Sequence, residues 1–310
     1  MANHSCDPNA ITFADGPRQT MISTRTIAKD DEITIAYIDT SNPFSYRQAE
    51  LQRNYDFTCA CNKCRKGPTL REDLFLRSAA ETPVSDEPTD MMHIMDQRYA
   101  QDPRYYIGPA PGERRLAAIQ GMAFTLWEES QRSIDPTLAL RKAQEGLDLC
   151  RKTGIWPIHR QPYPHLKHQK NLKLFQLGNI DLAWRGAIYR HFELDPILIP
   201  AEHHPTRIVN TWSLIQWTNH YYNQQDSPHL HDILSTGFSF EKVLWHLLHQ
   251  VARLAKATLG NGRITAAVQN KLVDMRDGIE EVAPGYTQHL GEGIQEQIRM
   301  FRAFDEDAKW

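Results

Sequence analysis

The 310-residue sequence has no long apolar run and no excess of positive charge. No stretch approaches the roughly 18 apolar residues of a membrane-spanning helix, and the chain does not start with a basic-then-apolar signal sequence. We therefore expect an intracellular protein, in the nucleus or the cytoplasm or both, that does not bind membranes. A formal net charge of -3 disfavours direct nucleic-acid binding by bulk charge. A chromatin protein stays compatible with this composition.

Several catalytic motifs are also missing. The sequence has no Ser-His-Asp elbow and no glycine-rich phosphate loop. Three histidine pairs occur, at His203-His204, His229-x-His231 and His246-x-x-His249. Because no carboxylate pattern of a helical metalloprotease accompanies them, surface or partly buried histidines explain these pairs better than a metal site.

The sequence has only five cysteines, and four of them occur at metal-ligand spacing. Cys59, Cys61 and Cys64 lie close together and leave a tetrahedral zinc site one ligand short. Cys6 is the only other cysteine in the first half of the chain, so we predict a zinc site that joins the two segments. His4 is a competing fourth ligand, and four reduced thiols without a metal are the remaining alternative. Four thiolates leave no open position, which makes such a zinc structural rather than catalytic.

The first part of the chain favours strands. A β-branched run over 20–25, a polar turn over 28–32 and a second apolar run over 33–38 predict a hairpin. Tyr37 ends the second run on its more apolar face, where a buried hydroxyl needs a partner. Residues 45–55 suit a short helix that leads into the cysteine segment.

The remainder of the chain favours helices. Asp135 as N-cap and Pro136 at the first helical position mark one clear start. Apolar stripes at helical spacing include Leu116, Ile119, Ala123 and Leu126, then Ala139, Ala143, Leu147 and Cys150. We expect Cys150 to be a small buried hydrophobe, and we expect the tryptophans of the later helices to be core anchors: Trp184, Trp212, Trp217 and Trp245. The sequence therefore predicts an α+β fold, with a small β-rich part and then a mostly α-helical domain that is repeat-like but has no fixed sequence period.

Three ordered motifs resemble the C-terminal half of a SET domain and the post-SET zinc segment that follows it. The motifs are Asn3-His4-Ser5-Cys6-Asp7-Pro8-Asn9, Glu32-Ile33-Thr34-Ile35-Ala36-Tyr37-Ile38-Asp39 and Tyr55-Asp56-Phe57-Thr58-Cys59-Ala60-Cys61-Asn62-Lys63-Cys64. The resemblance is to proteins of the SET-and-MYND (SMYD-like) type. It covers residues 1–67, and the helical remainder resembles the C-terminal domain of that group in character alone.

This resemblance implies a protein-lysine methyltransferase that uses S-adenosylmethionine. Asn3 and His4 would line the cofactor pocket, and Phe57 would pack on the adenine ring. Tyr37 would contact the cofactor and face the reacting methyl group and the target amine with its hydroxyl. The four cysteines would hold a structural zinc ion. The partner would be a protein substrate with a target lysine, on a histone or on another protein, and we expect a monomer.

The resemblance also divides the chain. Residues 1–44 correspond to the C-terminal half of a SET domain, 45–68 to the post-SET zinc-binding segment, 69–114 to a linker and 115–310 to the helical domain. Because the family places a glycine-bearing cofactor strand before the Asn-His motif, the sequence resembles an N-terminally truncated SET protein. We therefore expect this chain alone to be weakly active or inactive. The alternative is a non-enzymatic protein, in which a zinc-stapled helical scaffold binds partner proteins.

Overall fold

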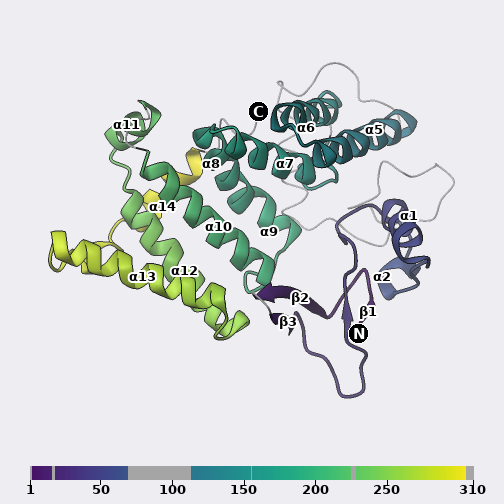
Figure 1. Ribbon diagram of the computed structural model, residues 1–310, viewed down its shortest axis with the longest axis horizontal. Helices are drawn as coiled ribbons and strands as arrows, with labels where there is room; N and C mark the ends of the chain where they lie inside the picture. The colour runs from purple at the N-terminus through teal and green to yellow at the C-terminus, as the bar shows by residue number, and fades with distance from the viewer. Residues whose placement is uncertain (1, 16–17, 69–112, 155, 225–227, 305–310) are drawn as a thin grey trace. The chain divides into compact units, whose positions relative to one another are not determined.

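The fold is shown by a computed structural model, which describes residues 2–15, 18–68, 113–154, 156–224 and 228–304 (Figure 1). Short strands near the N-terminus are followed by helices, so the predicted α+β class and the helical C-terminal region are confirmed. The predicted linker over 69–114 lies almost wholly outside the described residues.

The chain forms two compact units. The first unit comprises Met1–Thr12 and Ser23–Leu177, and the second comprises Phe13–Ile22 and Gly178–Trp310. These units group the chain by its contacts, and they differ from the predicted segments 1–44, 45–68, 69–114 and 115–310, whose boundaries stay predictions.

A parallel strand pair lies at the start of the first unit. β1 (Asn3–His4) pairs with β4 (Thr34–Ile35), with Asn3 opposite Thr34 and His4 opposite Ile35. The backbone N–H of Ser5 donates to the Ile35 carbonyl at 3.0 Å, directly after the strand. This pairing brings Asn3 and His4 beside the strand that precedes Tyr37.

The predicted hairpin of residues 20–25 with 33–38 is wrong in its pairing. β3 (Arg18–Ser23) pairs instead with β2 (Ala10–Asp15), and β4 pairs with β1. The polar turn exists, since the Asp31 N–H donates to the Ala28 carbonyl at 3.2 Å, but it does not bring β3 and β4 together.

The side chain of Asn9 explains why the second run does not pair with β3. Its Oδ1 accepts the backbone N–H of Thr34 at 2.8 Å, and its Nδ2 donates to the Glu32 carbonyl at 2.9 Å. The Thr34 N–H and the Glu32 carbonyl are therefore bonded to a side chain instead of to a strand on that edge.

Two helices flank the cysteine segment. The predicted helix over 45–55 is confirmed as α1 (Phe44–Tyr55), and α2 (Asn62–Arg65) follows. Asp56 ends α1 in the left-handed conformation, with φ 57°, and its N–H donates to the Gln52 carbonyl at 3.1 Å. This turn directs the chain toward the cysteines.

Three further helices lie in the described residues of the first unit: α5 (Glu113–Arg132), α6 (Pro136–Arg151) and α7 (Tyr163–Gln176). The predicted cap of α6 is confirmed, because the Asp135 carboxylate accepts the Thr137 N–H at 2.9 Å. The second predicted stripe is also confirmed, since its four residues, Cys150 among them, have an exposed fraction of 0%.

Helices α5 and α7, with Gln161 just before α7, pack on the segment that follows Tyr37. The Tyr46 ring stacks on Phe124 of α5 with a centroid distance of 4.2 Å. Three side-chain hydrogen bonds also join the two parts: Tyr46 to Glu128 (2.7 Å), His165 to Asn42 (3.0 Å) and Gln161 to Ser41 (2.8 Å). Residues 41–46 and helices α5 and α7 therefore belong to one packed body.

The second unit is built from helices around an aromatic core. Besides the strand residues within Phe13–Ile22, its described helices are α8 (Ile180–Tyr189), the π-helix η2 (Arg190–Leu194), α9 (Asp195–Leu198), α10 (Pro205–Tyr222), α11 (Pro228–Ser235), α12 (Phe240–Leu259), α13 (Arg263–Val282), the 3-10 helix η3 (Tyr286–His289) and α14 (Ile294–Ala303). Trp184 is fully buried and stacks on Tyr221 at 4.3 Å, which confirms it as a core anchor. Trp212, Trp217 and Trp245 are only partly buried. None of the helices in the described part of the chain combines the length and apolar character needed to cross a membrane.

Candidate metal and active site

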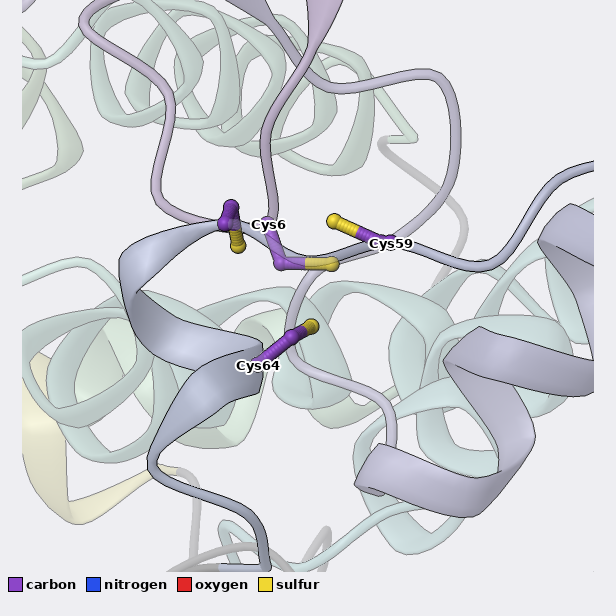
Figure 2. A group of neighbouring side chains, drawn as sticks. Cys6, Cys59 and Cys64 are labelled. Atoms are coloured by element: carbon purple, nitrogen blue, oxygen red, sulfur yellow. The ribbon is translucent and has the colours of Figure 1, made fainter.

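Four cysteine sulfurs converge beside β1. Cys6 follows β1, Cys59 and Cys61 precede α2, and Cys64 lies in α2. Figure 2 shows Cys6, Cys59 and Cys64 directed toward one another, and the four sulfur atoms all lie within 4.8 Å of each other. A tetrahedral zinc ion with Zn–S distances of about 2.3 Å needs S–S distances of about 3.8 Å. The donor set and its spacing therefore fit a four-thiolate zinc site after small adjustments.

The cysteine segment is held against α1 by a reciprocal pair of hydrogen bonds. The Gln48 side chain donates from Nε2 to the Cys59 carbonyl at 3.0 Å and accepts the Cys59 N–H through Oε1 at 2.9 Å. On the other side of the group, Lys63 Nζ donates to the Thr40 carbonyl at 2.8 Å. The Gln48 bonds fix the backbone at Cys59, and the Lys63 side chain links the other end of the cysteine motif to Thr40, which limits the entropy that metal binding has to remove.

The electrostatics of the group favour a bound cation. Burial would raise the pKa of the Cys61 thiol, but hydrogen bonds to its sulfur, chiefly from the backbone of Cys64 and Cys6, lower this pKa to about 6. The pKa of Cys64 is raised by its hydrogen bond with Cys6, by burial and by the charges of neighbouring sulfurs. Thiolates this close repel one another, and a divalent cation offsets that repulsion.

His4, the alternative fourth ligand, lies beside the four sulfurs. Its Nε2 is 3.2 Å from the Cys6 Sγ, a hydrogen-bond distance, and its Nδ1 accepts the backbone N–H of Tyr37 at 3.1 Å. Burial, assisted by the positive charge of Arg47 and opposed by Cys61, lowers the pKa of His4. The structure thus brings Cys6 into the sulfur group and gives His4 contacts to both Cys6 and Tyr37.

The Tyr37 hydroxyl has the partner that its partial burial requires. It donates to the Ala2 carbonyl at 2.7 Å, so the oxygen lone pairs are left to accept other contacts. The Tyr55 hydroxyl in turn donates to the Tyr37 carbonyl at 3.2 Å. Tyr37 is therefore fixed through its N–H, its carbonyl and its hydroxyl.

Four rings, His4, Tyr37, Tyr55 and Phe57, form an aromatic cluster around this tyrosine. The Tyr37 centroid is 5.4 Å from that of His4 and 5.0 Å from that of Tyr55. The Phe57 centroid is 5.9 Å from His4 and 6.5 Å from Tyr55. Tyr55 is 47% exposed, so one side of the cluster offers π surface to a ligand.

Asn3 differs from the other predicted cofactor residues. Its side chain is exposed and donates from Nδ2 to the Glu32 carboxylate at 2.6 Å. Neighbouring residues of a strand face opposite sides, so Asn3 and His4 of β1 project in different directions. The structure therefore brings His4, Tyr37 and Phe57 together and directs the Asn3 side chain to Glu32.

Two contributors were not assigned a role from the sequence. Tyr55 belongs to the aromatic cluster, and the fully buried Arg47 donates to the Asn42 carbonyl. Arg47, Leu51 and Tyr55 recur at four-residue spacing and so share one face of α1. That stripe was the signal from which both residues could have been found.

Comparison with known proteins agrees with the N-terminal motifs. The family model of the SET domain matches residues 1–38. The SET domain and MYND-type zinc finger protein 6 of Schizosaccharomyces pombe is 43% identical over 70 residues, which is 23% of this chain and 14% of that protein. The histone-lysine N-methyltransferase ATXR2 of Arabidopsis thaliana is 46% identical over 67 residues, 20% of this chain and 14% of that protein. The N-lysine methyltransferase SMYD2 of Gallus gallus is 30% identical over 92 residues, 30% of this chain and 21% of that protein.

The matched stretches thus span only 14% to 21% of the length of these three relatives. Within that limit the predicted resemblance is confirmed: residues 1–38 match the SET domain, and the N-terminal part of the chain is similar to SET-and-MYND proteins.

Proposed function

We propose that this chain is part of a protein-lysine methyltransferase that uses S-adenosylmethionine. The similarity of its SET-domain segment to proteins named as lysine methyltransferases supports this proposal. The observation that carries it is the fixed position of Tyr37, whose hydroxyl proton is directed to the Ala2 carbonyl at 2.7 Å within the aromatic cluster.

Tyr37 would align the target amine. Methyl transfer to lysine requires a neutral amine in line with the donor methyl group, and fixed geometry supplies much of the rate enhancement of such a step. Because the Tyr37 proton is held by Ala2, the phenol oxygen is available to accept an N–H of the incoming amine. The cofactor supplies the methyl group on a positively charged sulfonium. Tyr37, Tyr55 and Phe57 would attract that charge through their ring faces.

The four cysteines would hold a structural zinc ion in this proposal. All four positions of a tetrahedral site would be filled by thiolates, so the ion would have no open position for chemistry. Its role would be to join the segment after β1 to the segment before and within α2. That connection keeps Phe57, two residues before Cys59, beside His4 at a centroid distance of 5.9 Å.

The test is transfer of a labelled methyl group from S-adenosylmethionine to lysines of core histones and of a mixed protein extract. Tyr37→Phe should reduce transfer at least about 100-fold, the scale of losing one well-placed oxygen in an active site. Tyr46→Phe is the matched control, because it also removes a hydroxyl whose hydrogen bond is 2.7 Å long, here to Glu128.

Unchanged transfer by the Tyr37→Phe protein would contradict the assigned role of Tyr37. A folded, zinc-loaded chain that transfers no methyl group would agree with the weak or absent activity expected of this chain alone, and equally with the non-enzymatic scaffold.

A further inference from the structure

We infer that His4 is a positioning residue that couples the four-cysteine group to the backbone of Tyr37. The inference concerns the site of the proposed function and rests on it only in giving Tyr37 a catalytic role. It assigns His4 a task in addition to the cofactor contact that the family resemblance implies.

The hydrogen bonds of His4 allow a single protonation state. The backbone N–H of Tyr37 is a donor only, so Nδ1, 3.1 Å away, has to offer a lone pair. A neutral ring then carries its proton on Nε2, which lies 3.2 Å from the Cys6 Sγ. His4 therefore donates to Cys6 and accepts from Tyr37 at the same time.

We call the two hydrogen bonds of His4, to Cys6 and from Tyr37, the His4 bridge. The bridge lies just beyond the end of the backbone pairing of β1 with β4. The β1–β4 pair ends with His4 opposite Ile35, and the Ser5 N–H still reaches the Ile35 carbonyl at 3.0 Å. Two residues later the Tyr37 N–H finds its acceptor in a side chain of β1 instead of the backbone. With the Tyr37 hydroxyl bonded to the Ala2 carbonyl, both ends of this tyrosine are held by residues at β1.

A metal-bound Cys6 would strengthen the bridge. A thiolate accepts a hydrogen bond from an N–H more strongly than a neutral thiol does. Groups that hydrogen-bond a metal ligand orient it, and their removal commonly lowers metal affinity about 10- to 100-fold. A change in the metal would thus move Cys6, then the His4 ring, and then the backbone of Tyr37.

Two substitutions separate the halves of the bridge in the zinc-loaded chain. His4→Gln can keep a donor near the position of Nε2 and loses the acceptor for Tyr37, whereas His4→Asn can keep an acceptor near the position of Nδ1 and loses the donor to Cys6. The readouts are the rate of zinc release to a chelator and the Tyr37 amide resonance in protein labelled with nitrogen-15 tyrosine. The sequence has 11 tyrosines, and the Tyr37 resonance is the one lost in Tyr37→Phe.

We expect His4→Asn to release zinc about 10- to 100-fold faster while its Tyr37 resonance stays near that of the unsubstituted chain. We expect His4→Gln to keep slow release and to shift the Tyr37 resonance. Exchange of zinc for cadmium should shift this resonance in the unsubstituted chain and in neither variant. His220→Gln, at an exposed histidine of α10, should behave as the unsubstituted chain.

The inference would be overturned if cadmium shifted the Tyr37 resonance in both variants as much as in the unsubstituted chain. Packing rather than His4 would then couple the cysteine group to Tyr37. If neither variant folds, nitrogen-15 shifts of the His4 ring in the unsubstituted chain decide the matter. A proton on Nε2 alone supports the inference, and a proton on Nδ1 overturns it. Methyl transfer is not a readout, so failure here is distinct from failure of the proposed function.

Discussion

Cys61 is the least buried of the four sulfurs, and several hydrogen bonds converge on it. It is partly exposed, whereas Cys6, Cys59 and Cys64 are buried. Backbone N–H groups and the Ser5 hydroxyl lower its pKa to about 6 against the effect of burial. This sulfur is therefore prepared to bind a metal as a thiolate near neutral pH.

We predict that Cys61→Ser loses the bound zinc and destabilises the segment from Phe57 to α2. A structural zinc site with three thiolates loses the closed donor set on which its folding energy depends. Metal analysis after dialysis measures the outcome. The matched control is Cys150→Ala, which removes a cysteine that is 0% exposed in α6 and should leave the zinc content unchanged. A full equivalent of zinc in the Cys61→Ser protein would contradict the ligand assignment.

The cysteine group could be predicted from the sequence more completely than the aromatic residues beside it. Ligand spacing is a local pattern, so Cys59, Cys61 and Cys64 could be recognised without knowledge of the fold. The role of Tyr55 depends on where the end of α1 meets Tyr37, and their ring centroids are 5.0 Å apart only because the chain has folded. Such contacts between segments 18 residues apart have no local signature.

At the scale of elements, α6 and α7 approach closely at one glycine. A Cβ atom added to Gly146 would lie 2.8 Å from Cδ2 of Leu166, whose own exposed fraction is 0%. Gly121 of α5 has nothing within 4 Å of the same imagined atom. Two helical glycines of the first unit are thus present for different reasons.

We predict opposite effects of alanine at these two positions. Gly146→Ala should lower the free energy of unfolding by about 1 kcal/mol, because overpacking a buried contact costs more than helix propensity returns. Gly121→Ala should raise it by about 0.5 to 1 kcal/mol through propensity alone. Urea unfolding of the two variants measures both. An equal gain at both positions would show that Leu166 relaxes freely.

Helices were predicted from the sequence more reliably than strand pairings. The cap at Asp135 and the buried stripe of α6 depend on residues within a few positions of each other, and both were predicted correctly. The strand pairing was predicted wrongly because the side chain of Asn9 takes the Thr34 N–H, at 2.8 Å. Propensity identifies a segment that can be a strand and says nothing about its partner.

At the scale of the whole molecule, helices α5, α6 and α7 belong with the N-terminal residues that match the SET domain. Hydrogen bonds such as Tyr46 to Glu128 (2.7 Å) and His165 to Asn42 (3.0 Å) lie inside the first unit, which extends to Leu177. Helical periodicity reports which face of a helix is buried but not what buries it. The sequence therefore placed a boundary near residue 114, where the composition changes, while the contacts group α5 to α7 with the N-terminal residues.

The second unit contains a buried histidine that makes its stability depend on pH. Burial, with a contribution from Arg207, lowers the pKa of His191 to about 4. In the unfolded chain a histidine has an ordinary pKa of 6.5, so the unfolded state takes up a proton at higher pH than the folded state and acid favours unfolding. The contribution of His191 is complete above pH 6.5 and is lost as the pH falls toward 4.

We predict that the second unit loses about 2 kcal/mol through His191 between pH 6.5 and pH 5. Thermal unfolding across this range should therefore show a steeper loss of stability for the unsubstituted chain than for His191→Phe. His249→Phe, at an exposed histidine of α12, serves as the control and should keep the steep dependence. Equal slopes for the unsubstituted chain and His191→Phe would contradict this assignment.

The most direct test of the central claim is calorimetric titration of S-adenosylmethionine into the zinc-loaded chain. The account predicts saturable one-to-one binding that weakens when the π surface is reduced by Phe57→Ala and persists in Tyr46→Phe. Binding by the His4, Tyr37, Tyr55 and Phe57 cluster would support a methyltransferase site. No detectable heat from a sample shown to be folded and zinc-loaded would contradict the claim that this chain holds the cofactor, and would mean that the chain is a fragment or a scaffold that binds partner proteins.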